Sequence, residues 1–234
     1  MHALPGPDPM TALGVREAYR LWAPTYAAET AISVIEASLV DALTPDLSTL
    51  RLLDAGCGEG RRLLRAGAAS AVGVDLSPEM LRAGVGLDIH RPGLRTLTGD
   101  VRALPLPDRA FDVVWCRLVI GHLQEIDAVY AELGRVADHG AAVIVTDFHP
   151  QAQAAGHRRT FRAEGQVHEI EHYVHTLRDH VRAAGAAGLR LRAGAQGRVG
   201  PGVRGFYERA GRLSLYQEHL DLPMVLALAF QRED

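Results

Sequence analysis

An apolar run that ends in a glycine-rich turn is the feature that most constrains the fold of this chain. Residues 51–55 form the run, and glycines follow at positions 56, 58 and 60. Because glycine tolerates positive φ and has no side chain to collide with a ligand, this spacing predicts a strand and a tight turn close to a bound group. Asp75 closes a second apolar run, where a carboxylate can accept both hydroxyls of a ribose. The pattern therefore indicates a nucleoside-binding site.

The chemistry of the turn separates a dinucleotide from a cationic nucleoside. A dinucleotide fingerprint requires Gly or Ala three positions after Gly58, where a pyrophosphate meets the helix N-terminus, but this position is Arg61. Asp54 and Glu59 also belong to the turn, and their charges would repel phosphates. The acidic turn favours a ligand with an ammonium and a sulfonium. An NAD-dependent oxidoreductase, the alternative enzyme, is also disfavoured because the chain has no Tyr-x-x-x-Lys pair.

Two motifs carry a resemblance to a known family. Residues 54–60 match Asp-x-Gly-x-Gly-x-Gly, which resembles motif I of the class I S-adenosylmethionine-dependent methyltransferases. Residues 19–26 are similar to the Tyr-x-x-x-Ala-x-x-Tyr segment of the ubiquinone/menaquinone-type members, which are methyltransferase type 11-like. The resemblance implies an α/β, Rossmann-like fold with a seven-stranded mostly parallel sheet, helices on both faces and an N-terminal helical lid. It also implies S-adenosylmethionine as cofactor, S-adenosylhomocysteine as product, and methyl transfer to O, N or C of a small metabolite.

The residues that the resemblance assigns to the cofactor would contact different groups of it. Asp75 would bind the ribose, although it can also cap the helix that follows it. Asp100 would accept a hydrogen bond from the adenine amino group, and the Val101 amide would donate one to a ring nitrogen. Without the resemblance, Asp100 is typical of a turn. Aromatic rings attract a sulfonium by about 0.5 to 2 kcal/mol per contact, which supports Tyr19 and Tyr26, with core packing as the alternative. The expected cofactor contacts are Tyr19, Tyr26, Asp54, Gly56, Cys57, Gly58, Gly60, Asp75, Leu76, Met80, Asp100, Val101, Cys116 and Leu118.

Length and apolar periodicity predict one domain. At 234 residues the chain suits a single α/β domain with a sizeable core. We expect 1–45 to form the N-terminal helical lid, 46–150 the S-adenosylmethionine-binding core, and 151–234 the C-terminal part of the same domain, with substrate-covering insertions at 151–170 and 200–222. Periodicity predicts strands at 51–55, 71–75, 95–99, 111–116, 141–147, 189–192 and 224–230, and helices at 12–22, 25–43, from 78, at 126–136 and at 174–184.

Composition limits the other function classes. A formal charge of -3 gives no general attraction to polyphosphate, so nucleic acid is not expected as a partner. The chain has no lysine and no asparagine, which excludes a Schiff-base lysine. Apolar runs fall short of the roughly 20 residues that span a bilayer, and the N-terminus has no signal pattern. We therefore expect a cytoplasmic protein without membrane contact that is a monomer or a homodimer.

The acceptor side has two candidate bases, which apply where the acceptor is a hydroxyl. His149 follows the fifth predicted strand, and His122 follows the fourth, at the edge where open α/β sheets bind substrates. A neutral imidazole there would accelerate transfer by about 100- to 10,000-fold. The alternatives are a capped loop histidine for His149 and a satisfied histidine at a helix start for His122. Motifs of cytosine and adenine DNA methylation are absent, which narrows the acceptor toward small molecules. The rival functions are a noncatalytic S-adenosylmethionine-binding regulator and a methyltransferase of RNA or protein.

Two clusters outside the motifs have a possible ligand role. His168, His172 and His175 have i, i+4, i+7 spacing, which would align them on one helical face. We expect that face to be solvated and to hold no metal, because no acid or cysteine completes a recognisable set. Residues 158–162 carry three arginines that either face solvent or hold a carboxylate or phosphate of the acceptor.

Overall fold

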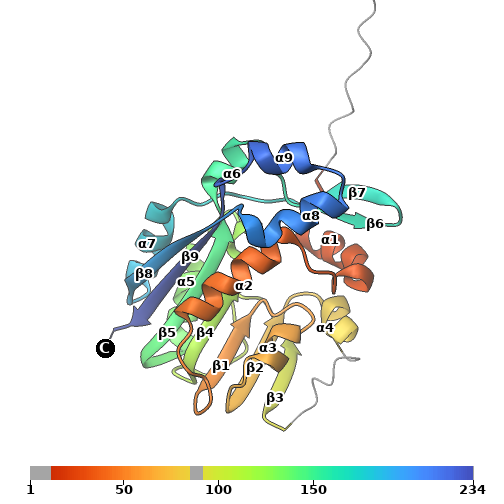
Figure 1. Cartoon of the computed structure of the whole chain (residues 1–234). Helices are drawn as coiled ribbons and strands as arrows, with labels where there is room; N and C mark the ends of the chain where they lie inside the picture. The colour runs from red at the N-terminus through yellow and green to blue at the C-terminus, as the bar shows by residue number, and fades with distance from the viewer. Residues whose placement is uncertain (1–11, 85–91, 234) are drawn as a thin grey trace, which may run out of the picture.

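A seven-stranded sheet forms the centre of the molecule in the computed structural model, which describes residues 12–84 and 92–233 (Figure 1). The strand order is β3-β2-β1-β4-β5-β9-β8. The first five strands are parallel, and the last two pair antiparallel with their neighbours. The predicted Rossmann-like, mostly parallel sheet is therefore confirmed. Its strands are β1 (Arg51–Ala55), β2 (Ser70–Asp75), β3 (Leu94–Thr98), β4 (Phe111–Arg117), β5 (Ala137–Phe148), β8 (Leu189–Arg198) and β9 (Pro223–Arg232).

Helices cover both faces of this sheet (Figure 1). The α-helices are α1 (Val15–Trp22), α2 (Ala31–Leu43), α3 (Arg61–Arg65), α4 (Pro78–Gly84), α5 (Asp127–Val136), α6 (Pro150–Ala154), α7 (Leu177–Ala186), α8 (Arg204–Arg209) and α9 (Leu213–Glu218). Short 3-10 turns are η1 (Ala23–Thr25), η3 (Ile120–His122) and η4 (Pro201–Val203). Residues 1–11, which begin the predicted lid, lie outside the described residues.

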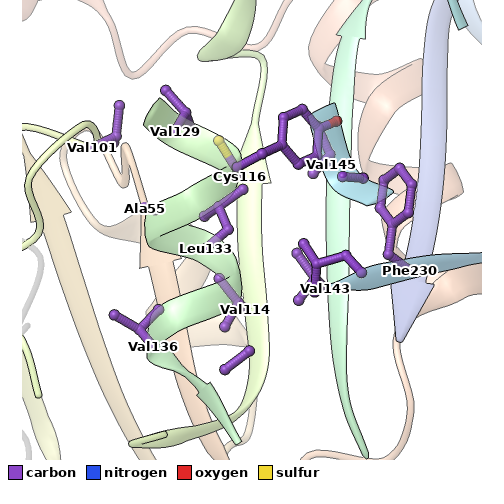
Figure 2. Close-up of a cluster of buried hydrophobic side chains, with 14 of the residues drawn as sticks. Ala55, Val101, Val114, Cys116, Val129, Leu133, Val136, Val143, Val145 and Phe230 are labelled. Carbon is purple, nitrogen blue, oxygen red and sulfur yellow. The ribbon is translucent and has the colours of Figure 1, made fainter. Parts of the chain in front are cut away.

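Alternating side chains of β4 divide the core into two layers. Val114 and Cys116 pack with α5 and α7, as Figure 2 shows for the α5 side. Val113 and Trp115 point to the other face and pack with α2 and α3. Because successive side chains of a strand face opposite sides, a run of apolar residues is what a strand buried on both faces requires. This burial fixes the carboxyl ends of the parallel strands at one edge of the sheet.

The segments above that edge were predicted as insertions, without helices or strands of their own. A second, two-stranded sheet pairs β6 (Thr160–Ala163) with β7 (Gln166–Glu169), and it lies beside α1 at the same end as α6, α8 and α9 (Figure 1). The Trp22 ring stacks on Phe161 with centroids 5.1 Å apart, which joins the N-terminal segment to β6. The expected substrate-covering insertions therefore contain a hairpin and three short helices.

Three helix predictions need correction. The expected helix at 12–22 begins at Val15, and the expected helix at 25–43 begins at Ala31, where the Thr30 hydroxyl caps it. The helical face expected for His168, His172 and His175 does not exist, because His168 lies in β7 and the other two precede α7. The Thr176 side chain accepts from the Asp179 amide at 3.3 Å and starts that helix at Leu177.

No helix of residues 12–84 and 92–233 is long and apolar enough to cross a bilayer.

Candidate functional site

A cleft of about 560 Å³ opens at the carboxyl ends of β1, β2 and β4. Its walls come from the glycine turn, from α1 and from the loops after β2, β3 and β4. Ten of the residues expected from the sequence line it, and they are Tyr19, Tyr26, Gly56, Gly58, Asp75, Leu76, Asp100, Val101, Leu118 and His122.

The glycine turn has the conformation that its sequence predicts. Gly56, Gly58 and Gly60 have φ of 89°, 58° and 80°, a region that side chains disfavour. The Gly56 amide donates to the Val74 carbonyl at 2.7 Å, which folds the turn back over β2. A Cβ on Gly56 would overlap Val119. A larger residue would therefore displace the loop that forms the opposite side of the cleft.

Asp75 lies where the turn and β2 meet. One carboxylate oxygen accepts from the Gly58 amide at 2.7 Å and the other from the Ser77 amide at 2.9 Å. Burial raises the pKa of Asp75, and the backbone hydrogen bonds partly oppose that rise. Each carboxylate oxygen keeps a second lone pair, so the group can still accept two hydroxyls from a ligand. The same contacts also make Asp75 part of the start of α4.

Five of the expected cofactor residues do not line the cleft. Asp54 is fully buried beneath the turn, and neither of its carboxylate oxygens has a hydrogen-bond partner among the described residues. Burial raises its pKa to about 6. Burial also raises the pKa of both cysteine thiols, so neither is an activated nucleophile. The five are Asp54, Cys57, Gly60, Met80 and Cys116.

A buried ion pair that the sequence reading missed supports the β4 wall. Arg117 donates to both oxygens of Glu36 at 2.8 Å, and the Thr146 hydroxyl adds a bond of 3.0 Å. Burial alone would raise the pKa of Glu36, but the bonds from Arg117 and the charge of Arg62 hold it below its ordinary value. A glutamate in the apolar stripe of α2 was the available signal. Its partner lies 81 residues away, which periodicity does not reveal.

Asp100 has a partner of its own. The Arg102 guanidinium donates to it at 2.6 Å, and the Arg102 amide at 2.9 Å, which lowers the pKa of Asp100. The acid is therefore both a turn residue and a charged group of the cleft wall.

Tyr19 and His122 form the wall opposite the glycine turn. The Tyr19 hydroxyl lies 3.0 Å from His122 Nε2, and the ring centroids are 5.4 Å apart. Burial raises the pKa of Tyr19 and lowers the pKa of His122 to about 3. A protonated tyrosine beside a neutral imidazole donates to it, so Tyr19 occupies Nε2. His122 Nδ1 then faces the Glu171 carbonyl at 3.4 Å.

His149 lies away from the cleft. It is buried at the start of α6, where its Nδ1 accepts from the Gln151 amide at 3.2 Å. This is the capped loop histidine that the sequence offered as the alternative to an acceptor-side base. The prediction of His149 as an acceptor-side base is therefore wrong, because the N-cap bond turns its imidazole toward α6.

The two clusters outside the motifs also have defined positions. His172 lies against His122, with centroids 5.8 Å apart, and His175 Nε2 lies 2.9 Å from the Leu123 carbonyl. Over the described ranges, no three His, Cys, Asp or Glu side chains are grouped to hold a metal ion. The arginine patch is divided, because Arg159 lines the cleft whereas Arg158 donates to the carbonyls of Gln153 and His157.

Comparison with known proteins shows what the cleft region is similar to. Residues 53–145 match the family described as methyltransferase domain. A malonyl-[acyl-carrier protein] O-methyltransferase of Herminiimonas arsenicoxydans is 32% identical over 133 residues, which are 55% of this chain and 44% of that protein. The chain spans less than half the length of the curated relatives that it matches.

Solved structures share the fold at low identity. An S-adenosylmethionine dependent methyltransferase from Mesorhizobium loti superposes with a TM-score of 0.65 and 21% identity, covering 85% of this chain and 98% of that one. The [4+2]-cyclase SpnF gives a TM-score of 0.68 at 17% identity and covers 96% and 98%. The fold is therefore common to methyltransferases and to a cyclase.

Proposed function

Because residues 53–145 match the family described as methyltransferase domain, we propose that the chain is a class I S-adenosylmethionine-dependent methyltransferase, which transfers a methyl group from S-adenosylmethionine to a small molecule in this cleft. The observation that carries the proposal is the Asp75 carboxylate, held by the amides of Gly58 and Ser77 at the glycine turn. Asp75 lines the volume that a nucleoside would occupy.

The residues present fit the cofactor. A volume of about 560 Å³ is within the range of about 300 to 1,000 Å³ that small-molecule sites have. Asp75 would hold the ribose, and Asp100 with the Val101 amide would hold the adenine. The rings of Tyr19 and Tyr26 line the same cleft and can attract a cation. When bound, S-adenosylmethionine supplies an electrophilic methyl group on a sulfonium.

The protein contributes alignment more than base catalysis. Holding two reactants in line can supply up to about 7 to 11 kcal/mol of the barrier. His122 is a weak base, because burial lowers its pKa to about 3 and both of its nitrogens face hydrogen-bond partners. His149 lies outside the cleft. We therefore propose His122 as a positioning residue of the acceptor wall rather than as the proton acceptor.

The N-terminal segment and the hairpin supply the cover. We propose that residues 12–45 act as a lid, because α1 contributes Tyr19 to the cleft and packs on β6. The division into a lid, a core at 46–150 and a C-terminal part remains a proposal. The same holds for assignment to the ubiquinone/menaquinone-type branch.

Cofactor binding without methyl transfer is the competing function. A cyclase shares this fold, so the fold alone does not decide between the two functions. Calorimetry with S-adenosylmethionine, S-adenosylhomocysteine and NAD tests the cofactor, and we expect the first two to bind and NAD to fail. Release of S-adenosylhomocysteine with a panel of small metabolites then tests transfer. Tight binding of NAD, or binding of S-adenosylmethionine without turnover of any metabolite, would contradict the proposal at the first or second step.

A further inference from the structure

The acceptor wall of the cleft contains a guanidinium that the cofactor proposal does not use. Arg159 lies in the loop before β6 and lines the cleft together with Tyr19, His122 and Glu171. Its backbone carbonyl accepts from the Ile170 amide at 2.8 Å, which fixes the loop to the segment after β7. Its positive charge acts electrostatically on Tyr19, His122 and His172. The positive charge therefore lies within the cleft.

Two of the other arginines that line the cleft already have partners. Arg102 is paired with Asp100 at 2.6 Å, and Arg117 with Glu36 at 2.8 Å. Arg158, the neighbour of Arg159, lies 3.9 Å from Glu169. Among residues 12–84 and 92–233, no carboxylate forms an ion pair with Arg159. Arg16 also lines the cleft, but it is exposed at the rim.

The acids on this wall do not neutralise Arg159. The Glu171 side chain is exposed and accepts from the Tyr173 hydroxyl at 2.6 Å, and Glu17 is exposed on α1. The groups on which the charge of Arg159 acts are Tyr19, His122 and His172. A half-buried guanidinium among neutral partners retains donors for a planar anion.

We propose that Arg159 binds a carboxylate of the methyl acceptor, and that the acceptor is therefore a small carboxylic acid. The inference rests on the proposed function and names the substrate class of that site. The Tyr19 hydroxyl lies 3.0 Å from His122 Nε2, and both residues line the cleft together with Arg159. We propose that Tyr19 and His122 act there as positioning residues.

Paired ligands test the proposal directly. The probes are benzoate with benzamide, hexanoate with hexanamide, and phenylacetate with phenylacetamide, titrated by ligand-observed NMR into the full chain with and without S-adenosylhomocysteine. Charged hydrogen bonds contribute roughly 1.5 to 3 kcal/mol, so we expect the wild type to bind the acids about 10- to 100-fold more tightly than the amides. Arg159→Gln should lose this preference and keep its affinity for S-adenosylhomocysteine.

Arg158→Gln is the matched control, because it removes the same charge one position away. It should keep the preference for acids. The absence of any preference in the wild type, its persistence in Arg159→Gln, or its equal loss in Arg158→Gln would overturn the proposal. Failure of the wild type to bind S-adenosylhomocysteine would instead contradict the proposed function. The titrations without S-adenosylhomocysteine test the preference for acids separately from cofactor binding.

Discussion

Glu36 occupies a position of α2 where the neighbouring residues are apolar, and it has no exposure to solvent. Its charge is stable there because Arg117, Arg62 and Thr146 surround it. The pair holds the end of β4, and with it the loop that forms one wall of the cleft.

Replacing Glu36 with Ala should destabilise the fold strongly. The Arg117 guanidinium would stay buried without its partner, and breaking a buried pair in this way costs about 3 to 5 kcal/mol. Urea unfolding measures the change. Glu29→Ala is the control, because its pair with Arg65 is 3.9 Å long and exposed, and such pairs contribute about 0 to 1 kcal/mol. Similar losses for the two variants would show that Glu36 has no special role.

Among the elements, helix α7 contains a glycine that nothing in its surroundings requires. A Cβ on Gly185 would meet no atom within 4 Å. Gly185→Ala should therefore stabilise the protein by about 0.5 to 1 kcal/mol, measured as a shift of the thermal midpoint. Gly188, just beyond the helix, has φ of 72°, and a Cβ there would overlap Arg232. Gly188→Ala should destabilise, and stabilisation by both substitutions would contradict this account.

The strands and the glycine turn were predictable because each depends on local pattern. Apolar runs predicted the strands of the sheet, and the glycine spacing predicted the turn. The β6–β7 hairpin was missed although Glu164 and Gly165 have φ of 50° and 77°, as a two-residue hairpin turn requires. Glutamate is not typical of that position, so the signal for a hairpin turn was weak. The histidine helix was wrong because i, i+4 spacing does not distinguish a helix from a strand followed by a loop.

At the scale of the whole molecule, buried neutral histidines link stability to pH. Burial lowers the pKa of His122 to about 3 and of His172 to about 4, from 6.5. As the pH falls below 6.5, the unfolded chain takes up protons that the native protein does not, so stability decreases by about 2 kcal/mol per histidine at pH 5. Asp54, whose pKa is raised to about 6, opposes this by about 1 kcal/mol.

We therefore expect a net loss of about 2 to 3 kcal/mol between pH 7 and pH 5 from these three groups. The free energy of unfolding, measured by urea at each pH, gives the profile. His157 and His149 also have pKa values lowered by burial and act in the same direction. In a double variant with His122→Gln and His172→Gln the slope should decrease, and an unchanged or rising profile in the wild type would argue against buried neutral imidazoles.

The arrangement of the cleft depends on contacts between distant parts of the chain. Tyr19 meets His122 across 103 residues, and Arg159 reaches the same wall from the loop before β6. The sequence identified Tyr19, Asp75 and the glycines through motifs. It could not separate Arg159 from Arg158, because their difference is the direction of each side chain in the folded loop.

The most direct test of the central claim is the affinity of Asp75→Ala for S-adenosylmethionine, measured by calorimetry beside the wild type and Asp112→Ala. Asp112 is an acid at the opposite end of the sheet, where it pairs with Arg51 at 2.7 Å. The loss of two charged hydrogen bonds to the ribose should weaken binding by at least about 100-fold in Asp75→Ala and leave Asp112→Ala unchanged. Equal affinity in Asp75→Ala and the wild type would contradict the assignment of this cleft to the cofactor.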